Sequence, residues 1–196
     1  MKKLLMLSIA LLIASTGFSQ KIKLISGSLS SVKGEDVLEI QFTYDNMRVG
    51  KMTEEDYVRD KRAEADKKDG DGGDRWHNAW LADRDNRFEP KFIELFNKYA
   101  AKADIIVDQY REDTKYIMVV NTYFIEPGFN VGISSKPAFV NMKISFVERS
   151  NPDRPVAVFD IIQARGSTAF DLGHRVQESY ALAGKKFGAA MKKFLK

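Results

Sequence analysis

Apolar and polar residues alternate along several segments of the chain, with the period of two that is typical of a half-buried strand. Segment 140–146 alternates in this way, and so does 37–44, where the apolar positions are Leu38, Ile40, Phe42 and Tyr44. Segment 116–125 is apolar at almost every position, as expected of a strand that is buried on both faces. The pattern also predicts strands at 21–27, 105–110 and 155–164. We therefore expect a sheet with 116–125 at its centre.

The C-terminal segment has a helical period instead. From about 175 to 196 an apolar residue recurs every three or four positions, at Val176, Tyr180, Ala183, Phe187, Met191 and Phe194. This stripe predicts an amphipathic helix that packs on the sheet. Gly184 and Gly188 lie one turn apart on it, which lets a neighbouring helix approach closely.

Segment 53–103 is predicted to be a helical insert with two interruptions. Its first helix, 53–68, is highly charged and has Thr53 as a suitable N-cap, so we expect it on the surface. The Gly- and Asp-rich stretch 69–74 and the polar stretch 83–86 are predicted to break the helix. A further helix is expected from Pro90 to about Ala103.

The order of these elements predicts the fold class. Strands come first, then helices, then a run of strands and a closing helix, which indicates an α+β protein. We expect a largely antiparallel sheet, helices packed on one face of it, and a closing C-terminal helix. Residues 20–196 are expected to form a single domain.

Residues 1–19 have the pattern of a signal peptide. Lys2 and Lys3 precede an apolar run, 4–14, and small or polar residues follow, with Gly17 and Ser19 at the expected cleavage site. The apolar run is too short to span a bilayer. We therefore expect an exported protein, located in the periplasm or outside the cell, that is not membrane-spanning after cleavage. No cysteine follows the run, so we do not expect a lipoprotein.

Charge and cysteine content exclude several classes of function. The formal net charge is +4 with Lys2 and Lys3 included, and no cluster of Lys and Arg resembles a phosphate-binding track, so no nucleic-acid partner is expected. The chain has no cysteine at all. Disulfides, cysteine nucleophiles and cysteine-ligated zinc are therefore excluded, and stability must come from packing.

The sequence predicts no metal site and no cofactor. Asp69, Asp71 and Asp74 lie in a Gly-rich loop, but their spacing departs from that of a calcium loop, and whether they bind an ion is left open. His77 and His174 are the only histidines, and neither lies in a ligand motif.

Catalytic motifs are also missing from the sequence. No nucleophile elbow and no phosphate-binding loop occurs, so no catalytic residue is predicted. Glu126, which follows the central strand and precedes Pro127 and Gly128, is interpreted as a turn residue.

The best candidates for a binding site are aromatic. Trp76 and Trp80 are spaced by one helical turn and lie near Arg84, a composition typical of interface hot spots. The same spacing suits a helix pressed onto a core, with arginines at its edge, and this second interpretation remains open. Phe129, in a turn, is the other candidate.

Several stretches together resemble a family of secreted bacterial proteins of unknown function. They are 48–58 (RVGKMTEEDYV), 76–99 (WHNAWLADRDNRFEPKFIELFNKY), 124–148 (FIEPGFNVGISSKPAFVNMKISFVE) and 178–191 (ESYALAGKKFGAAM). This resemblance implies no catalytic residues. The predicted architecture is also similar, more loosely, to small envelope α/β domains of outer-membrane assembly lipoproteins, although this chain lacks their lipid-bearing cysteine.

Together these features predict an exported, non-enzymatic envelope protein that binds a protein partner through Trp76, Trp80, Arg84 or Phe129. One alternative is a periplasmic protein that binds a small ligand between the helical insert and the sheet. Another is a hydrolase with an unrecognised carboxylate site. The oligomeric state is left open.

Overall fold

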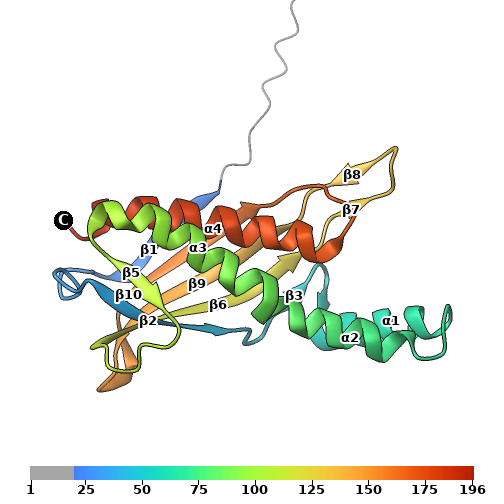
Figure 1. The fold of residues 1–196 in the computed structure, drawn as a ribbon, viewed down its shortest axis with the longest axis horizontal. Helices are drawn as coiled ribbons and strands as arrows, with labels where there is room; N and C mark the ends of the chain where they lie inside the picture. The colour runs from blue at the N-terminus through green and yellow to red at the C-terminus, as the bar shows by residue number, and fades with distance from the viewer. Residues whose placement is uncertain (1–19) are drawn as a thin grey trace, which may run out of the picture.

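The computed structural model describes residues 20–196, so the predicted signal peptide, 1–19, lies outside the described residues. Helices and strands alternate along the chain in the order expected of an α+β protein, which confirms the predicted fold class (Figure 1). The elements are β1 (Lys21–Gly27), β2 (Val37–Thr43), β3 (Arg48–Val49), β4 (Met52–Thr53), α1 (Glu54–Asp66), α2 (Gly72–Asp83), the π-helical turn η1 (Arg84–Phe88), α3 (Glu89–Ala100), the 3-10 turn η2 (Ala101–Ala103), β5 (Ile106–Asp108), β6 (Tyr116–Glu126), β7 (Phe129–Asn130), β8 (Ser135–Lys136), β9 (Phe139–Glu148), β10 (Asn151–Arg165) and α4 (Leu172–Phe194).

One large sheet has the strand order β1-β10-β9-β6-β2-β5. Its pairs are antiparallel from β1 to β6, whereas β2 pairs in parallel with both β6 and β5. Parallel neighbours need a long crossover connection, which the helical segment between β2 and β6 supplies. The predicted central strand, β6, lies inside the sheet, and its side chains Met118 and Val120 are fully buried.

Helices α3 and α4 lie side by side across one face of the sheet (Figure 1). The predicted stripe of α4 is buried from Val176 to Met191, which confirms that this helix closes the core. The helix begins at Leu172, earlier than predicted, because Asp171 acts as its N-cap: the carboxylate of Asp171 accepts a hydrogen bond from the amide of His174 at 2.7 Å.

The predicted helix break at 83–86 is wrong. The chain instead runs through α2, η1 and α3 without leaving the helical conformation. Local polarity suggested a loop, but tertiary packing holds the turn: Phe88 is buried and stacks on Tyr180, with ring centroids 5.1 Å apart. Of the predicted insert, only α1 and α2 project from the rest of the molecule (Figure 1). Helix α3 packs with α4 over the sheet and so belongs to the main body of the protein.

The N-cap of α1 is as predicted. Thr53 Oγ1 accepts a hydrogen bond from the amide of Asp56 at 3.1 Å. Acidic residues fill the first turn, where their negative charge interacts favourably with the positive end of the helix dipole. Within residues 20–196, none of the helices is both long enough and apolar enough to cross a membrane.

The two glycines of α4 contact α3 as the sequence suggested. A Cβ atom on Gly188 would lie 2.5 Å from the carbonyl oxygen of Phe96, and one on Gly184 would collide with the carbonyl of Phe92. Both obstacles are backbone atoms, which cannot move away unless the helices separate.

We expect Gly188→Ala to lower the free energy of unfolding by about 1 kcal/mol, because overpacking against backbone atoms costs about 2 kcal/mol and the gain in helix propensity returns about 1 kcal/mol. Urea denaturation measures this change. Ala189→Ser, an exposed substitution in the same helix, is the control and should change stability by less than about 0.5 kcal/mol. An unchanged midpoint for Gly188→Ala would show that α3 and α4 can move apart without cost.

Candidate functional site

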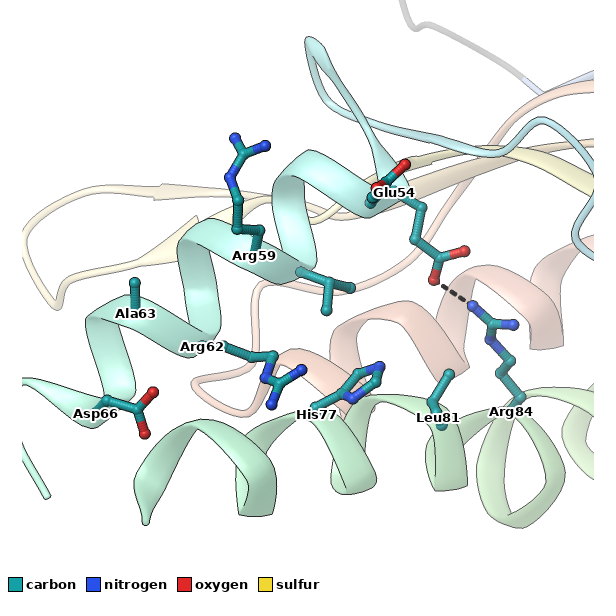
Figure 2. A pocket seen from close by; sticks show the side chains of 10 residues that line it. Glu54, Arg59, Arg62, Ala63, Asp66, His77, Leu81 and Arg84 are labelled. Atoms are coloured by element: carbon teal, nitrogen blue, oxygen red, sulfur yellow. Dashed lines mark hydrogen bonds and ion pairs between the residues drawn. The ribbon is translucent and has the colours of Figure 1, made fainter. Parts of the chain in front are cut away.

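The projecting helices enclose a groove between them, which we call the α1–α2 groove (Figure 2). Its volume is about 680 Å³ and it opens to solvent. We call its apolar lining residues the floor (Val58, Ala63 and Leu81) and its charged and polar lining residues the rim (Glu54, Glu55, Arg59, Arg62, Asp66, His77 and Arg84). Leu81 remains 41% exposed, so the groove presents apolar surface that residues 20–196 do not cover.

The predicted tryptophans do not line this groove; they belong to the aromatic cluster that joins the two helices. Trp76 stacks on Trp80 with ring centroids 5.8 Å apart, and Tyr57 of α1 packs against both rings. Trp80 is only 4% exposed, whereas Trp76 is partly buried. This arrangement is that of a helix pressed onto a core, the second of the two interpretations considered from the sequence. The cluster of Tyr57, Trp76 and Trp80 holds α1 and α2 together and so fixes the width of the groove.

Arg84 closes the end of the groove nearest the body. Its guanidinium pairs with Glu54, an interaction marked in Figure 2, and lies 4.0 Å from the ring centroid of Tyr44. The same Glu54 carboxylate accepts a hydrogen bond from the indole Nε1 of Trp80 at 2.7 Å. One carboxylate at the start of α1 therefore binds two side chains that lie one turn apart, Trp80 of α2 and Arg84 of η1.

The polar contacts continue from Tyr44 into the body. The Tyr44 hydroxyl donates a hydrogen bond of 3.0 Å to Glu89, and Gln109 Nε2 donates one of 3.1 Å to the same carboxylate. Burial raises the pKa of the Glu89 carboxyl above its ordinary value of 4.5, although these two hydrogen bonds act in the opposite direction. Burial likewise raises the pKa of Tyr44.

Sequence reasoning missed Glu54, Tyr44 and Glu89. The available signals were weak: Tyr44 ends an alternating strand, Glu54 lies in an ordinary N-terminal turn, and Glu89 precedes Pro90. Only the fold brings these residues to Arg84, which was predicted as a site residue.

Phe129 lies apart from this region. It is exposed on β7, in a small hairpin with β8 that projects from the body at a place distinct from α1 and α2 (Figure 1). The structure therefore does not bring Phe129 together with Trp76, Trp80 or Arg84.

Two of the three carboxylates of the 69–74 stretch form ion pairs with arginines. Asp69 pairs with Arg75 and Asp74 pairs with Arg62. Within 20–196, no group of His, Cys, Asp and Glu side chains is arranged to hold a metal ion. His77 faces the α1–α2 groove on α2, whereas His174 lies on α4.

The turn interpretation of Glu126 agrees with its contacts. Its carboxylate accepts a hydrogen bond from the amide of Gly128 at 3.3 Å and pairs with Lys136 at 3.0 Å. The residues that line the α1–α2 groove offer an occupant apolar contact and ion pairing.

Comparisons with known proteins give no family for this chain. No protein-family model matches it, and no curated protein matches it. Among solved structures it is similar to the PelC dodecamer from Paraburkholderia phytofirmans, at 11% identity and a TM-score of 0.42, covering 89% of this chain and 98% of that chain. A single-substitution variant of that dodecamer gives 14% identity and a TM-score of 0.41 with the same coverage. Likeness at this level assigns no function.

We expect Glu54→Ala to lower the free energy of unfolding by about 1–3 kcal/mol, because it leaves the buried Trp80 N–H and the largely buried Arg84 without their shared acceptor. Urea denaturation measures this loss of stability, and tryptophan fluorescence reports it where α1 meets α2, because both tryptophans lie on α2. Glu55→Ala, the exposed neighbour on α1, is the matched control and should cost less than about 0.5 kcal/mol. Equal effects of the two substitutions would contradict a structural role for Glu54.

The raised pKa of Glu89 predicts a particular pH dependence. The folded state holds this proton more tightly than the unfolded state, so the contribution of Glu89 to stability falls as pH rises from 4.5 through the folded-state pKa. Glu89→Gln cannot ionise and should lack this fall. Chemical denaturation of both proteins at a series of pH values gives the difference between their free energies of unfolding at each pH. The contributions of the other carboxyl groups are common to both proteins and cancel in this difference. Parallel profiles would contradict the prediction.

Proposed function

We propose that this protein is an exported, non-enzymatic binding protein and that a partner protein docks a short segment into the α1–α2 groove. The observation that carries this proposal is the open groove of about 680 Å³ with partly exposed apolar residues, including Leu81, on its floor. An exposed apolar surface with a polar rim is typical of interaction sites.

The rim is suited to exchange of partners. Arg59 pairs with Asp56 and Asp60, and Arg62 pairs with Asp74, in ion pairs whose side chains are all substantially exposed. Exposed ion pairs contribute little to stability, about 0–1 kcal/mol, so a carboxylate from a partner replaces them at low cost. The occupant that fits is a segment with one apolar anchor next to an acidic residue.

A small ligand is the second candidate, because the volume lies within the range of small-molecule sites, roughly 300–1,000 Å³. The open, charged groove favours a protein segment, since small molecules are usually enclosed on most sides. The signal-peptide pattern of residues 1–19 supports a partner in the periplasm or envelope.

We expect Leu81→Asp to weaken partner binding by about tenfold or more, since it places a charge on the apolar floor. The measurement is photo-crosslinking in the envelope fraction of the host, with a photoreactive residue at position 81, followed by mass spectrometry of the adduct. Competition by residues 20–196, with and without Leu81→Asp, gives the relative affinity.

Leu24, on β1, provides the matched control. It is 49% exposed, close to the 41% of Leu81, but lies outside the hairpin. A single protein adduct at position 81 and none at position 24 supports docking in the groove. An adduct of small-molecule mass favours the second candidate, and equal labelling at both positions contradicts the proposal.

A further inference from the structure

The β7–β8 hairpin and the loop that precedes α4 carry exposed apolar side chains next to each other. We call Phe129, Val131, Ile133 and Phe170 the apolar tip. Ile133 is fully exposed, at 101% of its reference area, and the remaining three are also exposed. Residues 128–135 (GFNVGISS) include no charged side chain. Exposed β-branched and aromatic side chains concentrated on two adjoining loops are unusual on a protein surface and mark a site of contact.

The backbone of the tip is already hydrogen-bonded within the hairpin. The amide of Val131 donates to the carbonyl of Ser134 at 3.0 Å, and the amide of Ile133 donates to the carbonyl of Val131 at 3.1 Å. The amide between them, that of Gly132, donates to Asn130 Oδ1 at 2.9 Å. The amides of residues 131, 132 and 133, which carry or separate the exposed side chains of this hairpin, thus have partners within the hairpin itself. This combination lowers the cost of moving the segment into an apolar medium, where an unpaired N–H group is expensive.

Arg175 holds the parts of the tip in place. This buried side chain donates from Nε to the carbonyl of Pro127 at 3.0 Å, and from its guanidinium to the carbonyls of Ala169 and Phe170 at 2.6 and 2.7 Å. Asn130 Nδ2 also donates to the carbonyl of Thr168, at 2.5 Å, across the two loops. The apolar residues are therefore presented by two loops anchored to the N-terminal turns of α4.

We propose that the apolar tip inserts into the interface of a phospholipid bilayer. The tip is convex and projects from the body, a shape that a deformable lipid surface accommodates (Figure 1). Its Phe, Val and Ile side chains, with no charged side chain in residues 128–135, are of the kind that partitions into the apolar part of the lipid interface. The ion pair of Lys136 with Glu126, at the base of the hairpin, limits the insertion to a shallow depth. This membrane site is separate from the α1–α2 groove and does not depend on it.

Vesicle flotation tests the proposal. Residues 20–196, which contain the whole described core, are mixed with vesicles of phosphatidylcholine and phosphatidylglycerol at high salt, where electrostatic adsorption is screened. The predicted signal peptide is left out because its apolar run would itself bind lipid. We expect the protein to float with the vesicles, and Val131→Ser combined with Ile133→Ser to weaken the partition by about tenfold or more, since the binding free energy scales with the apolar area buried.

Ile25→Ser is the matched control, because Ile25 is also an exposed isoleucine, at 57%, but lies on β1. It should leave flotation unchanged. Because the chain contains no cysteine, Ile133→Cys and Ile25→Cys can each be labelled with an environment-sensitive dye. A blue shift on vesicle addition at position 133 alone supports insertion of the tip. Absence of flotation, equal loss in the Ile25→Ser control, or equal spectra at the two positions would overturn the proposal.

Discussion

The close contact between α3 and α4 is the constraint on which the rest of the molecule depends. Gly184 and Gly188 let the backbone of α4 approach that of α3, so both helices fit over one face of the sheet. Because α3 is fixed there and continues backward through η1 without a break, α2 has to extend beyond the body (Figure 1). The α1–α2 groove is therefore a consequence of where α3 is held.

A set of polar contacts ties the projecting hairpin to the body at one end. Glu54 binds Trp80 and Arg84, and Arg84 lies on the ring of Tyr44, whose hydroxyl binds Glu89. These contacts lie beside the π-helical turn, a type of turn that often occurs at functional sites. Buried polar groups that satisfy one another in this way specify a single arrangement of the helices.

The elements with a strong period could be predicted from the sequence, whereas the site could not. The stripe of α4 and the alternation of β2 record which face is buried, so both elements were predicted, although α4 begins earlier than expected and Glu39, on the polar face of β2, is buried with Arg149 as its partner. The polar stretch 83–86 predicted a break where the chain is in fact helical. The contact that keeps it helical joins Phe88 to Tyr180, which are 92 positions apart in the sequence, so no local pattern reveals it. The groove has no local signature at all: Val58 and Leu81 look like ordinary helix positions until α1 and α2 are placed side by side.

The unbroken run from α2 to α3 also has a mechanical consequence. The 12 residues of α2 form an arm about 18 Å long whose inner end is continuous with the core. A sideways force on the outer end of this arm produces a bending moment at its inner end, where the π-helical turn acts as the fulcrum. Phe88 at the fulcrum stacks on Tyr180, and Tyr180 shares a hydrogen bond of 2.7 Å with Thr122 of the central strand. A force applied at the outer end of α1 and α2 is thus transmitted to the middle of the sheet through continuous secondary structure and is not absorbed by a loop.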